Sequence, residues 1–355
     1  MSQAAPFVFP GISTRVVFGS GTLANVGEEL ARLGHAHALL LSTPHQSDEA
    51  TRLAQTLGPV AAGVFAEATM HTPVAVTDKA VSVFQASGAT AVIALGGGST
   101  IGLGKAIATR TGADQICVPT SYAGSEMTDI LGETEGGVKT TRRDASIRPE
   151  TVIYDVDLTL GLPLPMTMTS ALNAIAHAAE ALYAADRNPV VVAMAERAFP
   201  VFRDALPRLA SAPRDADARA ETLYAAWLCS TALGYVAMGL HHKLCHTIGG
   251  AANTPHADTH AIMLPHTIGF NAAAVPDLLA PIDAAFGASP GKALFRLAAD
   301  IGAPTRLADL GVRETQLDAV ADLAVRNPYD NPRPFDRAAI RAILQDAWAG
   351  NEPGI

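Results

Sequence analysis

Short apolar runs alternate with amphipathic stretches along the first 160 residues. The runs at 37–43 and 91–99 are dense in aliphatic residues, and ICVPTS (116–121) and TVIYD (151–155) are similar, so all four predict buried strands. A stretch with helical periodicity precedes the first run, at 23–33. Strands that alternate with helices form parallel sheets, which bind ligands at the carboxyl ends of their strands.

The pattern changes after LPLPMTM, at residues 162–168. Ala-rich segments with helical periodicity follow at 169–185, 188–209 and 217–247, and continue intermittently to Trp348, without a strand pattern. We therefore predict an α/β N-terminal NAD(P)-binding domain over 1–160 and an all-α C-terminal substrate and catalytic domain over 161–355.

The composition agrees with two sizeable cores, because 49% of the 355 residues are hydrophobic and only 17% are charged. A net charge of −9 without a dense Lys/Arg run argues against a nucleic-acid partner. Cys117, Cys229 and Cys245 lie in apolar or helical contexts without a CxxC pair, which predicts buried, reduced thiols. The N-terminus lacks a secretory pattern and no apolar stretch approaches the ~18 residues of a membrane span, so we expect a cytoplasmic protein with no membrane partner.

Three consecutive glycines follow the apolar run at 91–95, in LGGGSTIGLGKAIA. Glycines let a backbone approach a ligand closely, and the N–H groups at a helix N-terminus attract phosphate. A tight turn between a strand and a helix that binds no phosphate could contain the same glycines. The loop PTSYAGSEMT (119–128) follows the next predicted strand, and two such loops in succession favour a dinucleotide site. The candidate cofactor-binding residues are Thr43, Gly96, Gly97, Gly98, Ser99, Thr120, Ser121, Tyr122, Ser125, Thr128 and Lys139.

Histidines concentrate in the predicted helical half. In NAIAHAAEAL, Asn173 and His177 are four residues apart and share a helix face. In GLHHKLCHTIGGAANTPHADTH, His242 and His246 have the same spacing, and His256 follows a proline. Clustered imidazoles indicate metal binding, acid–base catalysis or an anionic ligand, and the spacing alone does not choose among these.

Together these motifs resemble the iron-containing alcohol dehydrogenase superfamily, whose fold is similar to that of dehydroquinate synthase. The resemblance extends from RVVFGSG (15–21) through GGGS and GSEMT to NAIAHAAEAL and the histidine block. It implies metal-ligand positions at Asn173, His177, His242 and His256, where the superfamily has an aspartate and three histidines. Three of the four residues match, and the carboxylate does not.

Within the superfamily, YAGSEMT, NAIAH and NPYDNPRP (327–334) resemble the maleylacetate reductase branch. That resemblance implies NADH- or NADPH-dependent reduction of the carbon–carbon double bond of maleylacetate, a small dicarboxylate, to 3-oxoadipate in aromatic-compound degradation. It also implies a homodimer. We expect no bound metal, because Asn173 removes the only anion of the ligand set, although three histidines alone hold zinc in some enzymes.

The resemblance also implies that polar residues of the helical half line a cleft between the two domains and take part in the reaction. His246 is the first choice for proton donor and His242 the second. Asn173 would orient a neighbouring histidine or the substrate by hydrogen bonds. Cations or N–H donors must bind the substrate carboxylates, and the candidates are His177, His242, His256 and Arg333. The candidate catalytic residues are Asn173, His177, His242, Lys243, His246 and His256.

Two departures from the superfamily pattern concern the ligands. Ser42, Thr43 and Pro44 stand where many relatives carry an acidic residue that rejects a 2′-phosphate, so we expect both NADH and NADPH to serve. Gly102 stands where Asp is usual, which favours a dianionic substrate. The alternatives are a metal-dependent NAD-linked alcohol dehydrogenase of the same superfamily, a lyase that uses NAD transiently, and a non-catalytic dinucleotide sensor.

Overall fold

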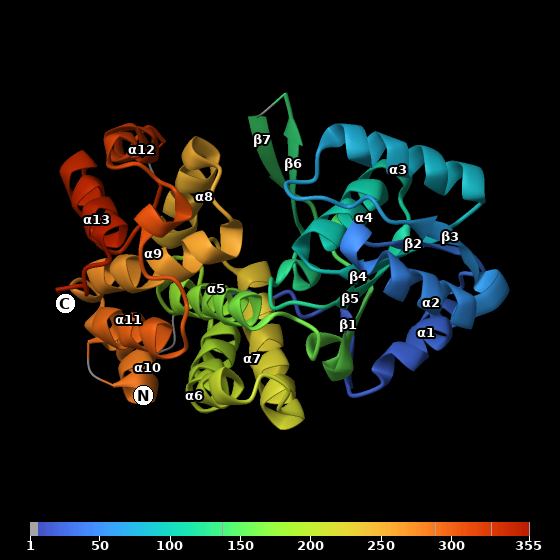
Figure 1. Ribbon diagram of the computed structural model, residues 1–355, viewed down its shortest axis with the longest axis horizontal. Helices are drawn as coiled ribbons and strands as arrows, with labels where there is room; N and C mark the ends of the chain where they lie inside the picture. Colours follow the sequence, from blue (N-terminus) through green and yellow to red (C-terminus); the bar gives the residue numbers. More distant parts are fainter. Residues whose placement is uncertain (1–5, 137, 288, 328, 355) are drawn as a thin grey trace. The chain divides into compact units, whose positions relative to one another are not determined.

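The computed structural model describes residues 6–136, 138–287, 289–327 and 329–354. These residues form two compact units, each described here by itself (Figure 1). One unit comprises Gly11–Leu162. The other joins the described residues of 163–355 to the N-terminal segment 6–10, where Phe9 packs against Tyr235 with ring centroids 5.0 Å apart. The assignment of cofactor binding to one unit and catalysis to the other stays a prediction.

The first unit is built on a six-stranded parallel sheet. In spatial order its strands are β1 (Arg15–Gly19), β8 (Thr151–Asp155), β5 (Asp114–Pro119), β4 (Ala91–Gly96), β2 (Ala38–Leu41) and β3 (Ala61–Phe65). The four strands predicted from apolar runs are present, as β2, β4, β5 and β8. The antiparallel hairpin β6 (Ile130–Glu135) and β7 (Val138–Arg143), which the apolar pattern did not predict, follows β5.

Helices cover both faces of this sheet. Side chains alternate along each strand, so successive residues pack against helices on opposite faces. Leu40 of β2 packs with α1 (Val26–Leu33) and α2 (Ser47–Leu57). Leu39 and Leu41 pack on the opposite face with α3 (Val74–Ser87) and α4 (Gly98–Thr111). The result is the predicted α/β unit with a parallel sheet, a type of sheet that binds ligands at the carboxyl ends of its strands.

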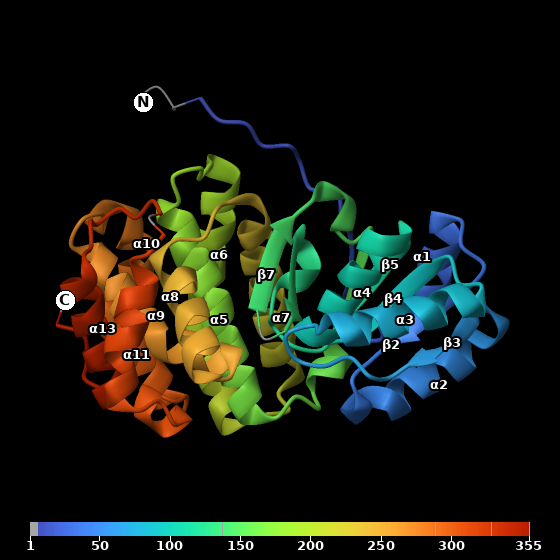
Figure 2. The same ribbon diagram turned by 90° about the horizontal axis from the view of Figure 1, so that it is seen from above.

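The second unit is built from helices and contains no strand within its described residues (Figure 2). Its helices are α5 (Leu164–Tyr183), α6 (Pro189–Ser211), α7 (Ala216–Tyr235), α8 (Leu240–Ala252), α9 (His256–Ala272), α10 (Pro276–Phe286), α11 (Pro290–Asp300), α12 (Leu317–Ala324) and α13 (Arg337–Ala349). Every residue of α5 from Thr167 to Tyr183 is buried. The small alanines of this segment therefore let α5 serve as the central helix of the unit.

The segment 217–247, predicted as one helical stretch, is divided between α7 and α8. Val236 has an extended backbone and Gly239 caps the start of α8. No single helix of the described chain is long and apolar enough to cross a membrane; α7 and α8 pass that test only as a pair, and they are bent by 92° at the break. All three cysteines are buried and free, as predicted.

Candidate active site

The glycine turn lies between β4 and α4. Gly96 has a φ of +153°, and a Cβ on it would lie 2.4 Å from Oγ1 of Thr100, so only glycine fits. The backbone N–H groups of Thr100 and Ile101 donate to the Gly97 carbonyl at 3.0 and 3.1 Å, and the turn thus passes directly into the helix. Within the described residues, no side-chain cap occupies the N–H groups at the start of α4. They are therefore available to a phosphate.

The second polar loop lies beside the first. Gly96 pairs with Pro119 across β4 and β5, and the N–H of Thr120 donates to the Gly96 carbonyl at 3.2 Å. A Cβ on Gly97 would lie 3.0 Å from Oγ of Ser121. The structure therefore brings these two groups of predicted cofactor residues together at one edge of the sheet.

Gln46, which the sequence motifs did not single out, connects the ends of two strands. Its Nε2 donates to Oγ1 of Thr120 at 2.9 Å, and its Oε1 accepts from Oγ1 of Thr43 at 3.4 Å. Because β2, β4 and β5 are neighbours in the sheet, this amide joins the loops that follow β2 and β5. A glutamine in a polar turn carries no sequence signal of such a role.

Lys105 of α4 holds the loop after β5 in place. Its Nζ is fully buried and donates to the carbonyls of Ser125 and Ile130, at 2.5 and 3.0 Å, and to Oγ1 of Thr128 at 2.8 Å. Burial lowers the pKa of Lys105 to about 7. The hydroxyl of Thr128 is thus used inside the loop, and the neighbouring Tyr122 is fully buried.

The remaining predicted cofactor residues are placed as follows. Ser99 lies in the first turn of α4, directly after Gly98. Lys139 lies on β7 opposite Thr134, and its side chain is outside the part of the chain that the structure describes.

In the helical unit, histidines from three helices gather in one cluster. His177 of α5 stacks on His242 of α8, with ring centroids 5.0 Å apart. His260 of α9 lies 4.8 Å from His242 and 4.1 Å from His256, and the His246 and His256 rings are 5.8 Å apart. His246 and His256 are exposed, whereas the other three are buried. The structure therefore brings together all the histidines predicted from sequence and adds His260.

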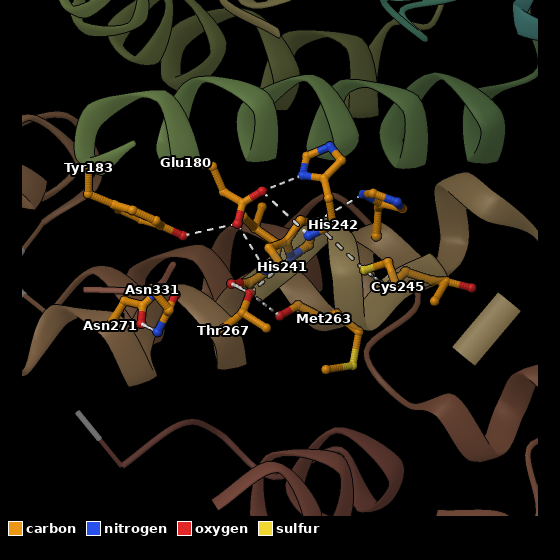
Figure 3. A network of polar contacts seen from close by, with 12 residues as sticks. Glu180, Tyr183, His241, His242, Cys245, Met263, Thr267, Asn271 and Asn331 are labelled. Carbon is orange, nitrogen blue, oxygen red and sulfur yellow. Dashed lines mark hydrogen bonds and ion pairs between the residues drawn. The ribbon is translucent and has the colours of Figure 1, made fainter. Parts of the chain in front are cut away.

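A fully buried carboxylate, Glu180 of α5, organises one side of this cluster (Figure 3). Its Oε2 lies 2.5 Å from Nδ1 of His242, and its Oε1 accepts from the backbone N–H of His241 at 2.9 Å. The hydroxyl of Tyr183 donates to the same Oε1 at 3.3 Å. The motif NAIAHAAEAL contains this residue, and the only sequence signal was a charge within an apolar helix.

A second chain of hydrogen bonds fixes the buried rings of His241 and His260. The hydroxyl of Thr267 donates to the Met263 carbonyl at 2.9 Å, so its oxygen accepts from Nδ1–H of His241, also at 2.9 Å. Nε2 of His241 then accepts from Nδ1–H of His260 at 3.0 Å. Burial holds the pKa of both rings well below the usual value, so both are neutral. Because Nδ1 carries the single ring proton of neutral His260, Nε2 of the same ring is an acceptor.

Four buried polar atoms of the cluster have no hydrogen-bond partner within the described residues. They are Oδ1 of Asn173, Nδ1 of His177, Nε2 of His242 and Nε2 of His260. Buried polar atoms are almost always satisfied in folded proteins. Several of them in one cluster therefore indicate a binding site for a polar ligand.

The metal-ligand positions implied by the resemblance do not reproduce an iron site. Asn173 contributes a neutral amide, and Glu180 is already used by His242 and the start of α8. Two groups in the described chain bring three ligand atoms within 4.8 Å of one another: His241, Cys245 and His260, and His246, His256 and His260. Neither group includes His177 or His242, although the second includes His256. Burial also raises the pKa of the Cys245 thiol, which keeps it protonated.

Lys243 and Arg333 lie apart from the histidine rings. Lys243 lines a cavity of about 530 Å³ together with Tyr183 and Tyr329, and no histidine lines this cavity. Nη1 of Arg333 donates to the Phe270 carbonyl at 3.0 Å, and the guanidinium lies 4.1 Å from the centroid of the Phe270 ring. The side chain of Arg333 is thus held by local packing.

Comparison with known proteins covers both units. Residues 13–156 match the iron-containing alcohol dehydrogenase model, and residues 167–348 match the C-terminal model of the Fe-containing alcohol dehydrogenase family. A maleylacetate reductase of Rhizobium sp. is 57% identical over 98% of this chain and 99% of that protein, and one of Burkholderia cepacia is 50% identical over the same shares.

Solved structures give the same result. The crystal structure of maleylacetate reductase from Agrobacterium tumefaciens is 56% identical, covers 98% of this chain and 100% of that one, and superposes with a TM-score of 0.96. An iron-containing alcohol dehydrogenase from Corynebacterium glutamicum is 35% identical over 98% of each chain, with a TM-score of 0.92. The chain therefore belongs to the iron-containing alcohol dehydrogenase family, and to its maleylacetate reductase branch.

Proposed function

We propose that this protein reduces the carbon–carbon double bond of maleylacetate to give 3-oxoadipate, with a hydride from NADH or NADPH. The observation that carries the proposal is the cluster of buried, unpartnered polar atoms at Asn173, His177, His242 and His260. It supplies buried hydrogen-bonding groups in the position where the family usually builds a metal site. The full-length similarity to maleylacetate reductases supports the same substrate.

The proposed reaction needs a stabilised oxyanion and a proton. Hydride adds to the alkene carbon β to the ketone, the electron pair of the double bond moves toward the ketone oxygen, and a proton then bonds to the adjacent carbon. N–H donors aimed at the developing oxyanion lower the barrier to such a step. We assign this stabilisation to His242, and proton delivery to His246, whose exposed ring exchanges protons with solvent.

The proposed enzyme acts without a metal. Asn173 supplies no negative charge, and an added carboxylate there would repel a substrate that carries two carboxylates of its own. The amide instead suits a hydrogen bond to the substrate or to an imidazole.

The proposed cofactor site is the sheet edge formed by the loops after β2, β4 and β5. The N–H groups at the start of α4 would bind the pyrophosphate, and the Gly96 turn would let it approach the backbone. The residues after β2 are Ser42, Thr43 and Pro44, none of which is acidic, so we expect activity with both NADH and NADPH. From the family resemblance we further propose a cytoplasmic homodimer, which sedimentation of the purified protein would test.

The position of a transferred deuterium tests the reaction directly. With NADH deuterated at the transferring carbon, the proposal predicts deuterium on a methylene carbon of 3-oxoadipate, observed by NMR of the product. Deuterium on a new carbinol carbon would show carbonyl reduction and contradict the proposal.

The second candidate, a metal-dependent alcohol dehydrogenase, is favoured by one observation, the close approach of His246, His256 and His260. It predicts that turnover of simple alcohols requires added iron or zinc.

A further inference from the structure

We propose that Glu180 is a positioning residue for the reaction, which fixes the ring of His242 so that its Nε2 faces the substrate. The inference rests on the proposed function, because it assigns His242 to the developing oxyanion. It begins from an unusual group, a carboxylate with no exposed surface on the central helix α5. Burying a charge is costly unless hydrogen bonds compensate for it.

The contacts of Glu180 are directed at the start of α8. Oε1 accepts from the N–H of His241 at 2.9 Å, and Oε2 lies 3.4 Å from the N–H of His242. These N–H groups belong to the first turn of α8, where backbone donors are unsatisfied and the helix dipole favours an anion. Backbone donors of the helix start therefore stabilise part of the charge of this carboxylate.

Gly239 makes room for this contact. A Cβ at position 239 would lie 3.2 Å from Oε1 of Glu180, tighter than an ordinary van der Waals contact. Most helices are capped by a Ser, Thr, Asp or Asn at this position. Here the capping group comes from α5 instead, and the same carboxylate also reaches the imidazole of His242.

The contact to the ring determines which nitrogen faces the ligand. An ionised carboxylate only accepts hydrogen bonds, so Nδ1 of His242 carries a proton and donates it to Oε2 at 2.5 Å. Nε2 lies on the far side of the ring and is buried without a partner in the described chain. The rings of His177 and His260, with centroids 5.0 and 4.8 Å away, pack around it. A flipped ring would lose the bond to Glu180, so this contact keeps Nε2 as the nitrogen available to a ligand. The proposed role requires the imidazolium form of the ring, in which Nε2 also carries a proton and donates it in a hydrogen bond to the oxyanion.

The central variant is Glu180→Gln, which keeps the side-chain length and an acceptor oxygen but removes the charge. We expect its kcat for maleylacetate to fall by about 10- to 100-fold, the usual effect of losing a group that orients a functional histidine. The KM for NADH and the midpoint of thermal unfolding should stay nearly unchanged. The matched control is Tyr183→Phe, which removes another buried hydrogen bond to Glu180 without affecting His242, and should retain kcat. A Gln variant with wild-type kcat would overturn the proposal.

A second readout does not depend on turnover. In protein labelled with ¹⁵N-histidine, the His242 resonances, assigned by their loss in His242→Gln, should show protonated Nδ1 and a strongly downfield Nδ1–H proton. Glu180→Gln should move that proton upfield. A wild-type ring protonated only at Nε2 would contradict the inference. If the wild type does not reduce maleylacetate, the proposed function fails, whereas the resonances still decide whether Glu180 orients His242.

Discussion

An amide stands at position 173, where the resemblance to the family implies an aspartate ligand. Asn173 is buried on α5, one helical turn before His177, and its Oδ1 has no partner in the described chain. We predict that Asn173→Asp gains affinity for zinc or iron, because a carboxylate joins the imidazoles of His177 and His242. The same variant should lose maleylacetate turnover, since the new charge repels a dianion.

Metal content after dialysis against zinc, together with kcat/KM, checks this prediction. Asn173→Ala is the matched control, because it removes the amide without adding charge and should gain no metal. An aspartate variant that binds no metal and keeps full activity would show that the residue at position 173 does not decide between the two chemistries.

His266 gives a prediction for stability at acidic pH. Burial lowers the pKa of this ring to about 4, against the weaker opposing effect of Asp346. Because the unfolded chain has the higher pKa, near 6.5, it binds more protons between pH 4 and 6.5. The contribution of His266 is therefore fully present above pH 6.5 and is lost as the pH falls toward 4.

The variant His266→Phe should lower the slope of unfolding free energy against pH in this window by about 1.4 kcal/mol per pH unit. Urea denaturation at several pH values measures the slope. A variant slope equal to that of the wild type would mean that His266 is solvated in the folded protein.

Among single residues, the sequence best predicts those that lie in motifs with a regular spacing. The spacing of His242, His246 and His256 correctly indicated that these rings gather. Glu180, Gln46 and Lys105 were not predicted as functional, because their roles depend on partners 20 to 74 positions away in the sequence. Local spacing carries no information about such partners.

At the scale of elements, the loop after β5 depends on Lys105 of α4. Lys105→Met would remove the Nζ donor from two carbonyls and from the hydroxyl of Thr128, whereas the Ser125 carbonyl would keep the N–H and the hydroxyl of Thr128 as donors. We predict a loss of unfolding free energy of about 2–4 kcal/mol, since each unsatisfied buried group costs about 1–3 kcal/mol and the loop relaxes in part. The KM for NADH should rise, because this loop lies at the proposed cofactor edge.

Lys79→Met is the matched control for Lys105→Met. Lys79 is exposed and, within the described residues, pairs with exposed Glu67, so its loss should cost about 0–1 kcal/mol. Equal losses in the two variants, measured by urea unfolding, would contradict the role assigned to Lys105.

The elements that the sequence predicted are those with continuous apolar runs. β4 and β5 are buried along nearly their whole length, so their composition is distinctive. β1 is mostly half-buried, and the hairpin β6–β7 is rich in Thr, Glu and Arg, so neither shows that signal. The break between α7 and α8 was hidden because its residues are apolar and contain no proline; Gly239 instead allows Glu180 to approach.

For the whole molecule, the change of pattern near residue 160 correctly predicted an α/β part followed by a helical part. It did not predict that residues 6–10 pack with the helical unit, because the contact of Phe9 with Tyr235 joins segments more than two hundred positions apart. Only the resemblance to a family, carried by motifs in both parts, connected this architecture to a reaction.

The measurement that tests the account most directly is NADH oxidation with maleylacetate, using protein treated with a strong chelator and assayed for residual metal. The account predicts full activity in the metal-depleted protein, no gain on adding iron or zinc, and 3-oxoadipate as the product. Activity that disappears with the metal and returns with iron or zinc would show that the site retains metal catalysis despite Asn173. Turnover of simple alcohols in place of maleylacetate would contradict the assigned reaction.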